Sequence, residues 1–236
     1  MSSVKILLDT SAYRHTVVQE IGVSEQAVEI FGRLSTVRMV QERAVEPKNA
    51  SEADEVEALR SIFDLARESK NIHFGVSWEL HQEFFHGTQK SPAPGGDLAE
   101  GINFEDVPSP LERGMFFSLP LDEYASREVK KAFIELICQF GEKPEEFPRR
   151  GIGGYELNEY ELGSLKSLGR FARACKVVPD AQWFDLFHLW TAERAGYQYF
   201  LTRDKKFVNL MTQTCRVKFD ALPVTPIGLW NLLSSG

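Results

Sequence analysis

Short apolar runs alternate with amphipathic segments along most of the chain. Residues 4–8 read VKILL, a nearly continuous apolar run that predicts a strand buried on both faces of a parallel sheet. Residues 54–70 carry apolar side chains every three or four positions, which is the spacing of an amphipathic helix. Residues 72–76 (IHFGV) and 199–201 (YFL) predict two further strands. This alternation predicts an α/β fold of three α/β/α layers with a mostly parallel central sheet.

The same patterns place the remaining elements. They predict helices over residues 25–34, 78–85, 126–140, 162–176, 184–195 and 229–233, and edge strands over residues 217–219 and 222–224. Ser77 and Ser126 stand where N-caps are expected, and Gly141 and Gly196 stand where helices end. Residues 47–53 are polar and predict a loop.

Residues 87–125 interrupt this alternation. Prolines and glycines are concentrated there, so we expect a long helical and loop insertion that lies outside the core. Loops of this length inside compact domains are unusual and often carry function. No linker separates two complete cores, so residues 1–236 are expected to form one domain.

Composition and charge narrow the function. The 236 residues are 43% hydrophobic and 26% charged, which is typical of globular proteins. The formal net charge of −7 argues against a broad basic face for nucleic acid. The sequence does contain a local basic strip, which by default is a solvated helix face, with phosphate contacts as the alternative. Its residues are Lys166, Arg170 and Arg173 on one helix face, with Arg149 and Arg150 in the segment RRGIGG.

Cysteine spacing and apolar run length bear on location. The three cysteines lie far apart and form no CxxC or Cys/His pattern, so we do not expect a zinc site. We expect the three cysteines to be reduced thiols. No apolar run approaches the roughly 18 residues of a membrane span, and the N-terminal run is too short for a signal peptide. We therefore expect a cytoplasmic protein with no membrane association.

Four acidic residues lie where a parallel sheet would place a site. Such sites lie beyond the carboxyl ends of the strands, and Asp9 and Asp204 each follow a predicted strand. Asp185 lies near the start of the helix before the second of these strands, and Glu83 lies on the helix after IHFGV. Clustered carboxylates repel one another unless a cation binds, and oxygen ligands favour Mg²⁺ or Mn²⁺. The pattern therefore predicts metal-dependent hydrolysis of phosphodiester bonds.

Three segments resemble the PIN-domain nucleases: KILLDTSAY, FDLFHLWTAERAG and YFLTRDKKF. In that family an Asp ends the first strand, a Glu lies on an early helix, and an Asp opens a late helix. A further Asp follows the next strand in a T-x-D setting. The resemblance therefore implies that Asp9, Asp185 and Asp204 are metal ligands and that the fold is PIN-like.

The resemblance assigns the remaining site residues less directly. VSWELHQEF aligns best with Glu83 as the fourth ligand, and Glu79, one turn earlier, is the alternative. Thr10 or Ser11, together with Thr202, resemble the hydroxyl residues that line the site in this family.

The function implied by the resemblance is a Mg²⁺- or Mn²⁺-dependent endoribonuclease that cleaves single-stranded RNA. The alternative is a non-catalytic PIN-like module that binds RNA or a protein. A phosphatase of the haloacid-dehalogenase type also begins with an apolar strand and an Asp, but Ser11 stands where that family needs a second Asp. An antitoxin-like or other protein partner and a homodimer stay open.

Overall fold

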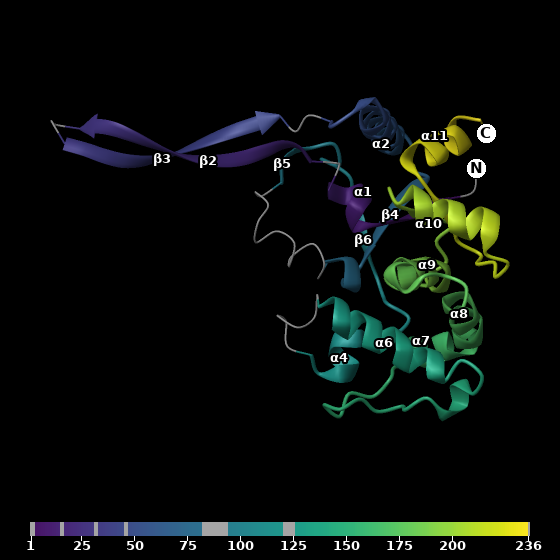
Figure 1. Cartoon of the computed structure of the whole chain (residues 1–236). Helices are drawn as coiled ribbons and strands as arrows, with labels where there is room; N and C mark the ends of the chain where they lie inside the picture. Colours follow the sequence, from purple (N-terminus) through teal and green to yellow (C-terminus); the bar gives the residue numbers. More distant parts are fainter. Residues whose placement is uncertain are drawn as a thin grey trace.

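The computed structural model describes residues 3–14, 17–30, 33–44, 47–81, 94–119 and 126–235. They form a three-layer α/β/α structure around a five-stranded parallel sheet, which confirms the predicted fold class (Figure 1). In spatial order the strands are β6 (Phe104–Val107), β4 (Ile72–Ser77), β1 (Val4–Leu8), β7 (Tyr199–Leu201) and β8 (Leu222–Val224). Along the chain these are the third, second, first, fourth and fifth strands, so the order reverses between β1 and β7.

The central strand β1 is covered on both faces. Successive side chains of a strand point to opposite faces. Leu7 accordingly packs into one apolar core, whereas Ile6 and Leu8 pack into the other. This explains why the sequence of β1 is a nearly continuous apolar run instead of an alternation.

Helices cover the sheet from both sides (Figure 1). On the face of Ile6 and Leu8 lie α2 (Ala50–Glu68) and α11 (Pro226–Ser234). On the face of Leu7 lie α6 (Arg127–Gln139), α8 (Leu168–Cys175) and α9 (Trp183–Arg194). The shorter helices are α1 (Thr10–Arg14), α4 (Arg113–Phe117), α7 (Glu159–Ser164), α10 (Lys205–Asn209) and a π-helix, Leu210–Thr214.

Helix ends follow the predicted capping residues in several places. The Ser126 hydroxyl accepts from the Val129 amide at 3.4 Å, and Gly196 ends α9 with a φ of +74°. The predicted loop over residues 47–53 is wrong from residue 50 onward, because Asn49 caps α2 by accepting from the Glu52 amide at 3.0 Å. Residues 78–81 are helical as predicted, and the rest of that predicted helix lies outside the described residues.

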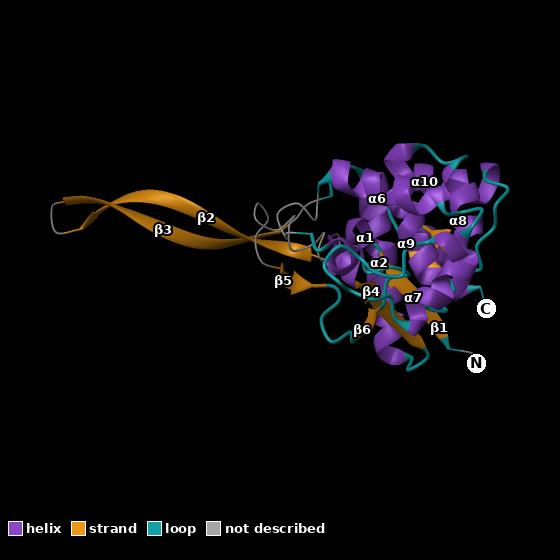
Figure 2. Ribbon diagram, turned by 90° about the horizontal axis from the view of Figure 1, so that it is seen from below, coloured by secondary structure: helices purple, strands orange, loops and turns teal. Residues whose placement is uncertain are grey.

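The helix predicted over residues 25–34 is wrong. Residues 17–44 instead contribute the antiparallel strands β2 (Val17–Ile30) and β3 (Arg33–Ala44), and the ribbon extends away from the body (Figures 1 and 2). A third strand, β5 (Pro94–Asp97), pairs with β2 at the base of the ribbon. The helical expectation rested on a short apolar pattern, and pairing with the neighbouring strand β3 overrides such weak local preferences.

Residues 98–119 correct the expectation that segment 87–125 lies outside the core. This stretch supplies β6 to the central sheet, and Val107, Leu111 and Phe116 are buried. Its prolines and glycines shape the turns around β6 and do not prevent β6 from pairing with β4. The edge strand predicted at 217–219 is wrong, whereas the one at 222–224 is confirmed as β8. No helix among the described residues is long and apolar enough to cross a membrane.

Candidate functional site

The candidate site lies where the strand order reverses, between the carboxyl ends of β1 and β7. Leu8 is paired with Leu201 in register, so the residues that follow them, Asp9 and Thr202, emerge at the same edge of the sheet. The Asp9 amide donates to the Leu201 carbonyl at 2.9 Å, and the Thr202 amide donates to the Val224 carbonyl at 3.0 Å. In open parallel sheets this crevice is the usual position for ligands.

Two hydroxyls hold the Asp9 carboxylate. The residue is 6% exposed, and its Oδ2 accepts from Thr202 Oγ1 at 2.8 Å and from Ser11 Oγ. Ser11 Oγ in turn accepts from the Arg203 amide at 3.1 Å, which ties the start of α1 to the loop after β7. Among the described residues, no Lys, Arg or His forms an ion pair with Asp9. A carboxylate this buried is costly without an opposite charge, so a bound cation would complete its surroundings.

Asp204 is linked to Asp9 through one hydroxyl. Its amide donates to Thr202 Oγ1 at 3.2 Å, the same atom that donates to Asp9. Its own Oδ1 accepts from the amides of Lys206 at 2.8 Å and Phe207 at 2.9 Å, so Asp204 is the N-cap of α10. The structure therefore gives Asp204 a capping role, and its role as a metal ligand stays a prediction.

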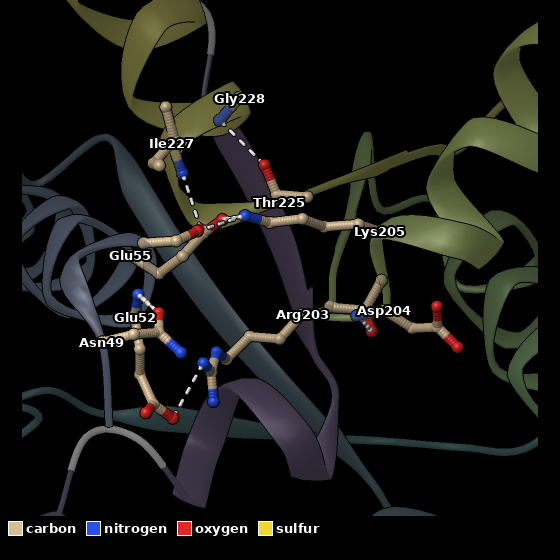
Figure 3. Close-up of polar contacts among 11 residues, drawn as sticks. Asn49, Glu52, Glu55, Arg203, Asp204, Lys205, Thr225, Ile227 and Gly228 are labelled. Carbon is tan, nitrogen blue, oxygen red and sulfur yellow. Dashed lines mark hydrogen bonds and ion pairs between the residues drawn. The ribbon is translucent and has the colours of Figure 1, made fainter. Parts of the chain in front are cut away.

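The basic neighbours of Asp204 turn toward α2. Arg203 Nη2 lies 3.1 Å from Glu52 Oε1, and Lys205 Nζ lies 3.0 Å from Glu55 Oε1. Figure 3 shows both side chains pointing at the start of α2, while the Asp204 carboxylate points the other way. The two ion pairs fix the loop after β7, and they place its positive charges against the acids of α2.

The other predicted ligands are Asp185 and Glu83, with Glu79 as the alternative to Glu83. Asp185 is partly exposed in the first turn of α9, the position predicted for it, and Glu83 lies outside the described residues. Glu79, the alternative to Glu83, is completely buried and pairs with the equally buried Arg113, Oε2 to Nη2, at 3.1 Å. Within the described ranges, no three His, Cys, Asp or Glu side chains are grouped to hold a metal ion.

Glu79 belongs to a second group of buried charges, which we term the acidic core cluster: Glu79, Glu112, Arg113 and Glu161. Glu161 is fully buried and accepts from the Glu112 amide at 2.8 Å and from Tyr155 Oη at 3.0 Å. Burial, followed by the charges of Glu79 and Glu161, raises the pKa of Glu112 to about 7. Arg113 binds Glu79 Oε2, and Tyr155 and backbone amides bind both oxygens of Glu161, whereas Glu79 Oε1 has no hydrogen-bond partner among the described residues.

The basic strip is less uniform than its sequence suggests. Arg170 forms an ion pair with Glu193, whose side chain is 4% exposed, so it has a structural partner. Arg150 pairs with an exposed glutamate in the neighbouring loop. The other members are exposed: Arg149, Lys166 and Arg173. A role in phosphate contacts therefore stays a prediction for these exposed residues above all.

Sequence reasoning missed a cavity beside Asp9. It has a volume of about 240 Å³, and Thr10, Tyr13, His81 and Phe104 are among the residues that line it. Thr10 was predicted as a site residue, whereas the other three were not. Tyr13 lies one helical turn beyond Asp9 in the motif KILLDTSAY, which was the available signal for it.

Comparison with known proteins finds no relative of this chain. The chain matches no protein-family model, no curated protein and no solved structure. The resemblance to PIN-domain nucleases therefore rests only on the sequence motifs around Asp9, Asp185 and Asp204. The geometry of this sheet edge is the remaining basis for a function.

Proposed function

We propose that this protein is a metal-dependent endoribonuclease that hydrolyses phosphodiester bonds of single-stranded RNA. The observation that carries the proposal is the Asp9 carboxylate, buried at the strand-order reversal and held only by hydroxyls among its described side-chain partners. Mg²⁺ is commonly held by one or two carboxylates, with water and phosphate oxygens completing its shell. The Asp9 carboxylate meets that minimum, and we propose Asp204, Asp185 and Glu83 as further ligands.

The residues around Asp9 would set its orientation before a substrate arrives. Thr202 Oγ1 and Ser11 Oγ both bind Oδ2, so the carboxylate is fixed by hydrogen bonds from two elements. Such supporting hydrogen bonds orient metal ligands and strengthen binding. A bound Mg²⁺ or Mn²⁺ would supply a more acidic water and polarise the phosphate. We therefore assign Ser11 and Thr202 as positioning residues.

The Asp9→Asn variant tests this proposal. Asparagine keeps the shape and can still accept from both hydroxyls, so folding should persist while the charge that binds a cation is lost. We expect cleavage of an end-labelled single-stranded RNA in Mn²⁺ to fall by at least about 100-fold. The control is Asp64→Asn, which removes an exposed carboxylate paired with Arg67 on α2. Cleavage by Asp9→Asn at the wild-type rate would contradict the proposal.

The metal requirement is a separate expectation. Chelation of divalent cations should abolish cleavage, and Mn²⁺ or Mg²⁺ should restore it. Ca²⁺ prefers more oxygen ligands and a looser geometry, so we expect it to bind without supporting the reaction. Cleavage that persists in a chelator would rule out this mechanism.

A non-catalytic RNA- or protein-binding module is the second candidate. It is favoured by the lack of a three-ligand group within the described parts of the chain. Such a module would have no high affinity for Mn²⁺. Calorimetric titration of the purified protein with Mn²⁺ separates the two, because only the nuclease is expected to bind the ion in a manner that Asp9→Asn abolishes.

A further inference from the structure

The cavity beside Asp9 lies at the carboxyl ends of β1 and β4. Its apolar walls come from Leu8 at the end of β1, Val76 near the end of β4, and Leu80 in the helical turn that follows. Leu8 and Leu80 are at most 2% exposed, so these walls are fixed parts of the two cores. A ligand in this space would therefore meet a preformed, largely apolar surface next to the proposed catalytic carboxylate.

Two aromatic rings form another part of the wall. The rings of Tyr13 and Phe104 meet edge to face, with centroids 5.8 Å apart and planes at 81°. The Phe104 ring also lies 6.1 Å from that of Phe74, which is buried beneath it. Aromatic walls of this kind favour a flat ring as ligand, because one ring can stack on a face while its edge meets another.

The polar groups at the cavity restrict the charge of the ligand. Asp9, Thr10 and His81 are among the residues that line the cavity. His81 Nε2 lies 3.3 Å from Oδ1 of Asp106, an exposed residue outside the lining. The Asp9 carboxylate disfavours an anionic group inside the cavity. An uncharged ring with hydrogen-bonding edges is the chemistry that fits.

The size of the cavity points to one ring system. Pockets for drug-sized ligands have volumes of roughly 300 to 1,000 Å³. At about 240 Å³, this cavity is below that range and is suited to a single base without its sugar and phosphate. The attached phosphate would then lie outside, on the side of Asp9.

We propose that this cavity binds one unpaired nucleobase of the RNA, next to the phosphate that is cleaved. The inference rests on the proposed function and adds the subsite that would restrict it to single strands. A base inside a duplex is stacked and paired, so it could enter the cavity only after flipping out of the helix. Stacking on aromatic rings tolerates any base, so this subsite would select unpaired structure more than sequence.

The test is an abasic scan of a short end-labelled oligoadenylate. One abasic residue is moved along the RNA, and kcat/KM for cleavage in Mn²⁺ is measured at each position. Loss of one base–aromatic stack should reduce kcat/KM about 10-fold or more at a single position relative to the cleaved bond. Binding in Ca²⁺, measured by fluorescence anisotropy, should weaken at the same position.

Variants locate the effect in the cavity. Tyr13→Leu removes a ring and should make the enzyme insensitive to the abasic residue, whereas Tyr13→Phe should preserve the penalty. The matched control is Tyr160→Leu on α7, a tyrosine outside the cavity, which should also preserve it. If Tyr13→Leu fails to fold, Phe104→Leu offers the same comparison from the other ring.

The outcomes distinguish the cavity from the nuclease. Cleavage with equal efficiency at every abasic position overturns the cavity proposal and leaves the nuclease intact. Absence of any cleavage by the wild type overturns the nuclease, and the cavity is then tested with adenosine alone by saturation-transfer NMR. Adenosine binding that Tyr13→Leu abolishes supports the cavity, and no binding to the wild type overturns it.

Discussion

Two groups of buried carboxylates in this protein differ in how their charge is matched. Glu79 is fully buried against Arg113, which is also fully buried. Asp9 is nearly as buried, yet its side-chain partners among the described residues are the hydroxyls of Ser11 and Thr202. The first acid is neutralised by the chain, and the second is held in place without being neutralised. Burial alone therefore does not distinguish an acid that the chain neutralises from one that is left to bind a cation, whereas the charge of its partners does.

The two groups of carboxylates also lie in different parts of the fold. Asp9 lies at the sheet edge where the strand order reverses, beside a cavity. The acidic core cluster joins α4 and α7 to the helical turn after β4, and Glu161 is also bound by backbone amides. We infer that the acidic core cluster stabilises the packing of these elements and that the edge around Asp9 is kept for a ligand. The predictions below separate these roles.

The largest effect on stability is expected from Arg113→Met. Removing the cation leaves Glu79 buried and unpaired, which should lower the free energy of unfolding by about 3 to 5 kcal/mol. Asp9→Asn keeps its hydrogen bonds, so it should change the free energy of unfolding by less than about 1 kcal/mol. Urea unfolding followed by circular dichroism measures both. The double variant Arg113→Met with Glu79→Leu should recover much of the loss. Equal free energies of unfolding for Arg113→Met and Asp9→Asn would contradict the proposed difference between the two carboxylates.

Glu112→Gln should flatten the pH dependence of stability. Burial raises the pKa of Glu112 from 4.5 to about 7 in the folded protein. Between these values the folded state binds more protons than the unfolded state, so stability falls as pH rises through this window. The fall is about 3 kcal/mol.

Urea unfolding of the wild type and of Glu112→Gln at several pH values checks this expectation. The wild type should lose stability relative to the variant from pH 4.5 to pH 7, with little further change above that window. Parallel pH profiles for the two proteins would show that Glu112 titrates normally in the folded state.

Thr202→Val tests the hydroxyls at the sheet edge. It deletes the shared donor to Asp9 and the acceptor for the Asp204 amide while keeping the shape. We expect a loss of about 1 to 2 kcal/mol in stability, together with weaker Mn²⁺ binding. Thr212→Val is the control, because Thr212 is exposed and its hydroxyl donates to the Val208 carbonyl, away from Asp9 and Asp204. If Thr202→Val bound Mn²⁺ as tightly as the wild type, Thr202 would have no role in metal binding.

The smallest effect on stability is expected at the basic strip. Changing Lys166 and Arg173 to Ala should leave unfolding unchanged, since both side chains are exposed. If they contact phosphates, the slope of RNA affinity against salt should decrease by about 1 to 2. Arg170→Ala should instead lower stability, because it breaks the pair with the buried Glu193. An unchanged slope would make the strip an ordinary solvated surface.

Much of the fold could be predicted because its signals are local. The apolar run of β1 and the N-cap Ser126 are read from a few neighbouring residues, and the structure confirms both. The position of Asp9 at the sheet edge follows from the same reasoning, since an Asp directly after a buried strand must emerge at its carboxyl end. Its hydroxyl partners Ser11 and Thr202 were also named from the sequence, although their shared contact with one carboxylate oxygen was not.

Only the tertiary structure decided what depends on distant partners. β6 has the sequence FEDV within a segment rich in proline and glycine, and its pairing with β4 makes it a strand of the central sheet. The ribbon of β2 and β3 also depends on pairing, although its two strands are neighbours in the chain. Glu79 and Arg113 lie 34 residues apart, so their ion pair could not be predicted from their spacing in the sequence. The sequence determined which residues can carry charge, and packing decided which charges the protein itself neutralises.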